Sequence, residues 1–238
     1  MRGCLFVLLL GAVALVLVVV VGLPAVASAV IAGGLAGAGL KADDTAVTVS
    51  SDPPTDLLGL RADTVHVTAT DATFRDLAIG DLDLTLGDVR FLDRTAGSVG
   101  GTLRDVTVTD TGAAGVRLDS ITLGGTGEAV TASTLVGKAE AERLIADGLE
   151  RELGVRPARV AISAPDGLAV TALGLTQHGR FLVTPAGDLA VRLTDGPAAG
   201  AEFVLLRGDS LPIRLDRVRV TDGGSLRLDG TLIGGLLG

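Results

Sequence analysis

The sequence has little of several residue types on which common binding and catalytic sites depend. It contains no tryptophan, no tyrosine, five phenylalanines and one cysteine. Carbohydrate and single-stranded nucleic-acid sites usually rely on aromatic stacking, so both classes of ligand lose support. The net charge of -8 leaves no basic stripe for phosphate backbones, and we expect no nucleic-acid partner. Because Cys4 lies in an N-terminal apolar run, the rest of the chain has no internal disulfide.

Residues for catalysis or metal binding are equally sparse. Of the two histidines, His66 lies between valines and is expected on the wet face of a strand, and His178 is expected in a turn. Neither has a cluster of metal-ligating residues around it at ligand spacing. No nucleophile elbow or phosphate-binding loop occurs. We therefore expect no catalytic residue, metal site or cofactor, although Asp81 and Asp83, which share a strand face, leave a carboxylate enzyme open as an alternative.

The N-terminus predicts export from the cytoplasm. Leu5 to Val21 is a nearly unbroken aliphatic run, preceded by the positive charge of Arg2 and followed by the small-residue sequence Ala25-Val26-Ala27. This pattern fits a cleaved signal peptide or an uncleaved membrane anchor, and residues 1–32 are assigned to one of the two. Either alternative places the rest of the chain outside the cytoplasm, and the cytoplasmic membrane is an expected partner. The remainder is then held at the extracytoplasmic face, or released into the periplasm or envelope if cleaved. Residues 33–55 are expected to form a tether.

Alternation of apolar and polar residues dominates the rest of the chain. Leu82 and Leu84 alternate with Asp81 and Asp83, and the same rhythm recurs along the chain. Period two is typical of strands with one dry and one wet face. Residues 56–238 are therefore predicted to be one β-rich domain. Its strands are expected near 63–71, 74–86, 88–92, 98–109, 115–123, 157–163, 167–175, 180–184, 188–194, 201–207, 211–221 and 225–232, the last two joined as a hairpin by Asp222-Gly223-Gly224.

One segment, about 133–153, breaks this rhythm. Its apolar residues recur at steps of three to five and so fit one side of a helix. Ser133 or Thr134 is the expected N-cap and Gly154 the expected C-terminal glycine. The fold class is accordingly α+β, predominantly β, with one long helix.

The dry faces of these strands are suited to hydrocarbon. Burial of acyl chains is worth about 0.8 kcal/mol per methylene, and aliphatic side chains are abundant here. An apolar groove and a closed core without ligand both fit the composition. The candidate lining residues of a groove are Leu82, Leu84, Val106, Val108, Leu144, Ile145, Leu149, Val218 and Val220.

The order of elements resembles a known family. An export segment, alternating strands, a helix ending in Leu153-Gly154-Val155, and closing strands through Val218-Arg219-Val220-Thr221-Asp222-Gly223-Gly224 and Leu226-Arg227-Leu228-Asp229-Gly230 are similar to the LmeA-type phospholipid-binding proteins of the actinobacterial cell envelope. This resemblance covers about residues 56–232. It implies curved antiparallel sheets wrapped around a long helix, and non-catalytic binding of a phospholipid or related acyl lipid in envelope lipid or glycolipid maintenance. An anchored structural or protein-interaction β-domain without a lipid ligand is the alternative.

Overall fold

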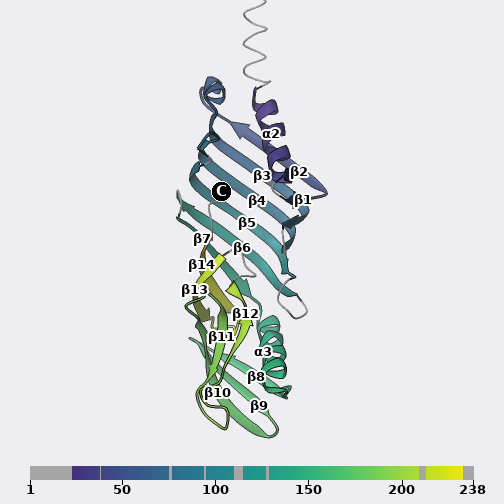
Figure 1. The fold of residues 1–238 in the computed structure, drawn as a ribbon, viewed down its shortest axis with the longest axis vertical. Helices are drawn as coiled ribbons and strands as arrows, with labels where there is room; N and C mark the ends of the chain where they lie inside the picture. The colour runs from purple at the N-terminus through teal and green to yellow at the C-terminus, as the bar shows by residue number, and fades with distance from the viewer. Residues whose placement is uncertain are drawn as a thin grey trace, which may run out of the picture.

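The computed structural model describes residues 23–37, 39–74, 77–93, 95–109, 115–126, 129–208 and 213–232. The aliphatic run Leu5 to Val21, expected to be a signal peptide or anchor, lies outside the described residues. Helix α2 (Leu23–Gly37) follows this run and contacts strand β2 (Asp44–Ser50) (Figure 1). Among the described residues, no helix has both the length and the apolar character that crossing a membrane requires.

The first half of the chain forms an antiparallel meander of long strands (Figure 1). Its members are β3 (Arg61–Phe74), β4 (Leu77–Arg90), β5 (Thr95–Val108), β6 (Val116–Thr126) and β7 (Ala129–Val136). The 3-10 helix η2 (Pro54–Gly59) precedes β3. The short strand β1 (Leu40–Lys41) pairs with the end of β3.

The segment 33–55 is more structured than a tether. Strand β2 pairs with β3 along its whole length, with Val47 opposite Val67 and Val49 opposite Val65. These valines continue the alternation of the sheet, so β2 is part of the sheet.

The second half builds a smaller sheet and then returns to the first. Strands β8 (Arg159–Ser163), β9 (Gly167–Ala172), β10 (Leu175–Val183), β11 (Leu189–Leu193) and β12 (Glu202–Leu206) form an antiparallel five-stranded sheet. Strands β13 (Ile213–Val220) and β14 (Leu226–Leu232) then pair as the predicted hairpin, and β14 joins β7 to complete a nine-stranded sheet. The expected antiparallel, predominantly β fold is confirmed.

His178 does not lie in a turn, as the sequence had suggested. It lies within β10 opposite Ala169, and the turn that joins β9 to β10 is at Leu173 and Gly174. Gly179, which indicated a turn, instead allows close strand pairing, because a Cβ there would lie 2.9 Å from the carbonyl oxygen of Arg192.

The expected helix begins later than Ser133. Helix α3 spans Lys138–Leu153, and its first residue follows Gly137, whereas Ser133 and Thr134 lie in β7. The preceding residues bury every second side chain, and the Thr134 hydroxyl donates to the Ser120 carbonyl oxygen. Period two therefore continues to Val136. The C-terminal glycine is placed as predicted, because Gly154 adopts a left-handed conformation with a φ of 68°.

Helix α3 packs mainly on the five-stranded sheet. The expectation that the long sheet wraps around this helix is therefore wrong. Its buried side chains pack mainly on β12 and β8, with a smaller contact to β6 (Figure 1). Gly148 permits this approach, since a Cβ there would lie 3.0 Å from a methyl carbon of Leu205. The buried side chains of both sheets and of α3 nevertheless form one continuous apolar cluster.

In the long strands, aspartates with a left-handed backbone interrupt the alternation of apolar and polar residues. We call each interruption a reset. Asp71, Asp88 and Asp105 have φ values of 47°, 50° and 49° within strands. At Asp105 the pairing of β4 with β5 skips one residue on each strand, and the aspartate lies beside Gly80. Each reset returns the following apolar residues to the same face, which we call the inner face of the nine-stranded sheet.

Candidate functional site

The candidate lining residues all lie on faces directed to the interior, but they do not form one site. Leu82 and Leu84 come from β4, Val106 and Val108 from β5, and Val218 and Val220 from β13. Leu144, Ile145 and Leu149 come from α3, which packs on the five-stranded sheet. The residues of β4 and of α3 therefore belong to different parts of the molecule.

Several of these residues are fully enclosed by protein. Val106, Val108 and Ile145 have no exposed surface, and Leu144 and Leu149 are buried. Side chains in this state contact other side chains of the core, which leaves a ligand no surface to cover. Among the candidates, surface remains mainly on Leu82 and Leu84 in β4 and on Val218 and Val220 in β13.

One incompletely covered part of the inner face lies in the middle of β4, β5 and β6. Leu84 is only half-buried. It lies opposite Gly101, which adds no side chain, and a Cβ at Gly101 would lie 2.6 Å from a methyl carbon of Leu84. The neighbouring leucines keep 7–9% of their surface exposed. We name this group the inner leucine patch; it consists of Leu82, Leu84, Leu86, Leu103 and Leu123.

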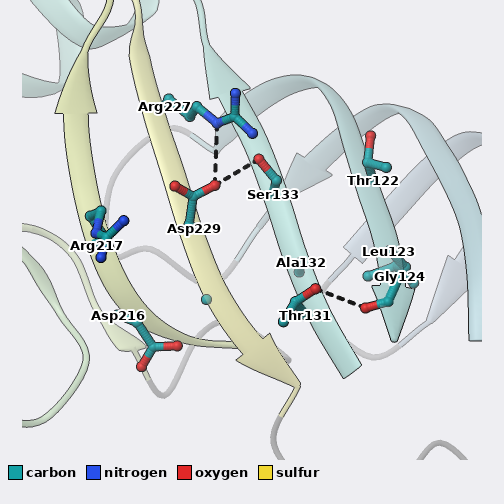
Figure 2. Close-up of a pocket in the computed structure, with 11 residues that line it drawn as sticks. Thr122, Leu123, Gly124, Thr131, Ala132, Ser133, Asp216, Arg217, Arg227 and Asp229 are labelled. Carbon is teal, nitrogen blue, oxygen red and sulfur yellow. Dashed lines mark hydrogen bonds and ion pairs between the residues drawn. The ribbon is translucent and has the colours of Figure 1, made fainter. Parts of the chain in front are cut away.

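A polar hollow of about 410 Å³ lies on the opposite face, over β6, β7, β14 and β13 (Figure 2). The Ser133 hydroxyl donates to Asp229 Oδ1 at 2.8 Å, and Arg227 Nε lies 3.3 Å from the same oxygen. Arg217 also borders the hollow, opposite Asp229 in the strand pairing. None of the candidate lining residues borders this hollow. Of the inner leucine patch, only Leu123 borders the hollow. The polar side chains of the hollow offer hydrogen bonds and charge, whereas the patch offers hydrocarbon.

The titratable groups singled out from the sequence are solvent-accessible. His66 lies within 3.1 Å of the Thr85 hydroxyl on the outer face, as expected. His178 Nδ1 lies 2.7 Å from Asp195 Oδ2, and the His178 backbone N–H also donates to this carboxylate. These two hydrogen bonds, the backbone one first, hold the pKa of Asp195 below its usual range. Within the described part of the chain, no three histidine, cysteine or acidic side chains gather as a metal site would require.

Asp81 and Asp83, the carboxylates of the enzyme alternative, both lie exposed on the outer face. Asp81 is opposite Arg104 in the strand pairing, and Asp83 lies 3.7 Å from His66. The structure thus places them on the wet face of β4, with Leu82 and Leu84 on the other. Neither borders the polar hollow.

Two features of the candidate site were not anticipated from the sequence. Gly101 lies within an expected strand, and nothing in the local pattern indicates that it leaves Leu84 only half-buried. The polar hollow draws on strands up to 108 residues apart, such as Thr122 and Gly230, so no local pattern could indicate it. The available signal in the sequence was the alternation of charged residues, at Arg217 and Arg219 of β13 and at Arg227 and Asp229 of β14. In the structure, Arg219 lies directly opposite Arg227.

Together these features define an elongated antiparallel β-sheet protein whose long sheet is aliphatic on its inner face and polar on its outer face (Figure 1). A model of the LmeA-like phospholipid-binding family matches residues 18–231, so the chain belongs to this family. No curated protein and no solved structure matches the sequence significantly.

Proposed function

We propose that this protein binds phospholipid without catalysis, at the extracytoplasmic face of the membrane, in envelope lipid or glycolipid maintenance. Membership of a phospholipid-binding family supports lipid as the ligand. The acyl chains lie along the inner leucine patch, between the middles of β4, β5 and β6. The observation that carries this placement is the half-buried Leu84 beside Gly101, within an otherwise enclosed aliphatic face.

Energetics favour this patch over the polar hollow for the acyl chains. Transfer of ten methylenes from water to an apolar surface is worth about 8 kcal/mol before ordering costs. Leucine side chains provide such a surface, whereas the carboxylates and guanidinium groups of the hollow would lose hydration beside hydrocarbon. Only part of the patch surface is exposed, so binding also requires the surrounding side chains to shift and admit the acyl chains.

Labelled phospholipid offered to delipidated full-length protein in detergent tests this function. The wild-type protein is expected to take up about one lipid per chain, and a well-folded sample without uptake contradicts the function itself. Leu84→Asp places a charge in the acyl path and is expected to weaken binding by at least about tenfold. Thr85→Asp is the matched control, since Thr85 is the next residue and lies exposed on the outer face.

The two variants distinguish whether the protein binds lipid from whether the lipid binds at the inner leucine patch. Wild-type affinity in Leu84→Asp would mean that lipid binds elsewhere, and equal loss in both variants would indicate a nonspecific charge effect. Circular dichroism confirms folding of each variant. If Leu84→Asp does not fold, Leu84→Asn provides the same comparison with a smaller perturbation.

A further inference from the structure

Three exposed leucines gather at one end of the long sheet. Leu92 is 75% exposed, Leu58 65% and Leu60 45%. They belong to two neighbouring turns, since the backbone N–H of Phe91 donates to the Leu60 carbonyl oxygen at 3.0 Å. We name Leu58, Leu60 and Leu92 the leucine tip. Large apolar side chains grouped in turns at the end of a molecule, and not used by its core, mark an interaction surface.

The N-terminal segment enters the fold beside this tip. Helix α2 contacts η2, the helix that contains Leu58, and begins at Leu23 in the same upper part of the molecule (Figure 1). The aliphatic run Leu5 to Val21 directly precedes α2 in the sequence. A lipid bilayer that holds this run therefore lies within reach of the leucine tip, whereas the β9–β10 turn lies at the other end of the molecule (Figure 1).

The charged residues around the tip offset one another, so its contact with a membrane depends more on the leucines than on charge. Arg61 and Arg90 lie opposite each other at this end, and both are exposed. Asp56, Asp63 and Asp88 border the same hollow as these arginines, so the basic charge is offset by acidic neighbours. Attraction to anionic headgroups is thus weak, and contact depends on insertion of the leucines.

We propose that the leucine tip inserts into the surface of the phospholipid bilayer and holds the long sheet against it. The leucines enter the region between headgroups and acyl chains, as apolar residues of membrane-surface proteins do. Strand β4 leads from the turn that holds Leu92 back to Leu86 and Leu84, so the docked tip directs this end of the inner leucine patch toward the bilayer. This inference goes beyond the proposed function, because docking does not require a lipid-binding site in the protein.

Depth-dependent quenching in full-length protein tests the docking directly. In a Cys4→Ser background, an environment-sensitive fluorophore is attached to Leu92→Cys or, as the matched control, to Leu175→Cys. Leu175 is also an exposed leucine beside a turn, but it lies next to the β9–β10 turn. The proteins are reconstituted in phosphatidylcholine vesicles with brominated acyl chains. We expect quenching and a blue-shifted emission at position 92 only, with little change in 0.5 M salt (roughly the concentration that screens charge beyond 4–5 Å).

Quenching at neither position, or equally at both, overturns the docking. Loss of quenching in high salt also overturns it, since it would assign the contact to charge.

A second measurement tests whether the leucine tip is needed to extract lipid from a membrane. The triple variant Leu58→Ser, Leu60→Ser, Leu92→Ser is expected to extract labelled phospholipid from vesicles at least about tenfold more slowly than wild type. It should bind the same amount of lipid delivered in detergent. Failure of the detergent arm in wild-type protein contradicts the proposed function alone, whereas unchanged extraction by the triple variant contradicts the role of the tip.

Discussion

Single aspartates determine how the long strands keep their leucines on one face. The left-handed conformation is costly for most residues with a Cβ, and aspartate tolerates it better than β-branched residues do. Asp88 adopts it with a φ of 50°, beside Gly97, where a Cβ would lie 2.8 Å from the aspartate Cβ. The glycine and the aspartate together allow the strands to remain paired through the reset.

Replacement of Asp88 by a β-branched residue is expected to destabilise the fold. Asp88→Val forces valine into the left-handed region and should lower the free energy of unfolding by about 1–2 kcal/mol, whereas Asp88→Gly should change it little. Chemical denaturation followed by far-ultraviolet circular dichroism measures both. Asp83→Val, in extended backbone on the same strand, is the control, and valine there should be neutral or slightly stabilising. Equal effects at the two positions would show that backbone conformation is not the cause.

At the scale of residues, alternation predicts which face a side chain occupies but not how well it is covered. Leu84 and Val106 have the same pattern in the sequence, yet Leu84 is only half-buried and Val106 has no exposed surface. The difference comes from neighbours on other strands, above all from Gly101 opposite Leu84. Coverage therefore depends on strand register, which the sequence pattern does not specify.

Helix α3 is fastened to the start of β6 by a group of charged hydrogen bonds. Arg143 donates to Glu140 at 2.6 Å and to the Gly115 carbonyl oxygen at 2.9 Å, while the Arg117 backbone N–H donates to Glu140. The hydrogen bond from Arg143, followed by that from Arg117, outweighs partial burial and lowers the pKa of Glu140. The ionised carboxylate thus stabilises the junction between the helix and the long sheet.

Glu140→Gln is expected to lower the free energy of unfolding by roughly 1 kcal/mol at neutral pH. Because folding lowers the pKa of Glu140, its stabilising contribution is present above the pKa of the unfolded chain and disappears as the pH falls through the lower folded value. The difference between wild type and variant should therefore shrink below about pH 4. Urea titrations from pH 3 to 7, a range of about four units around that pKa, test this. A difference that stays constant with pH would assign the loss to packing. Glu152→Gln, at an exposed position of the same helix, is the control.

At the scale of elements, strands were easier to predict than the beginning of the helix. Strand β14 and the hairpin it makes with β13 follow from alternation and the Asp222-Gly223-Gly224 turn. Leu135 and Val136 fit both periods, so periodicity alone predicts a start of α3 that is too early. Their assignment to β7 depends on pairing with β14, a strand about 90 residues later in the chain. Local periodicity contains no information about that partner.

At the scale of the molecule, the described residues form two sheets that share one apolar interior. Side chains from the nine-stranded sheet, α3 and the five-stranded sheet belong to a single cluster. Further links cross between the sheets, since the Val220 backbone N–H donates to the Pro165 carbonyl oxygen at 2.7 Å. Because neither sheet can lose its core without exposing that of the other, the described residues are expected to unfold as one cooperative unit.

Lipid binding should therefore stabilise parts of the molecule that the lipid does not touch. A ligand that binds only the folded state, at a free concentration about 100 times its Kd, stabilises that state by about 2.7 kcal/mol and slows exchange through global unfolding about 100-fold. Hydrogen exchange followed by mass spectrometry, with and without phospholipid, is the measurement. The slowest amides of β4 and β5 and those of β10 and β11 should slow by the same factor. Protection confined to β4 and β5 would mean that the sheets unfold separately, and that lipid bound to the inner leucine patch stabilises the nine-stranded sheet alone.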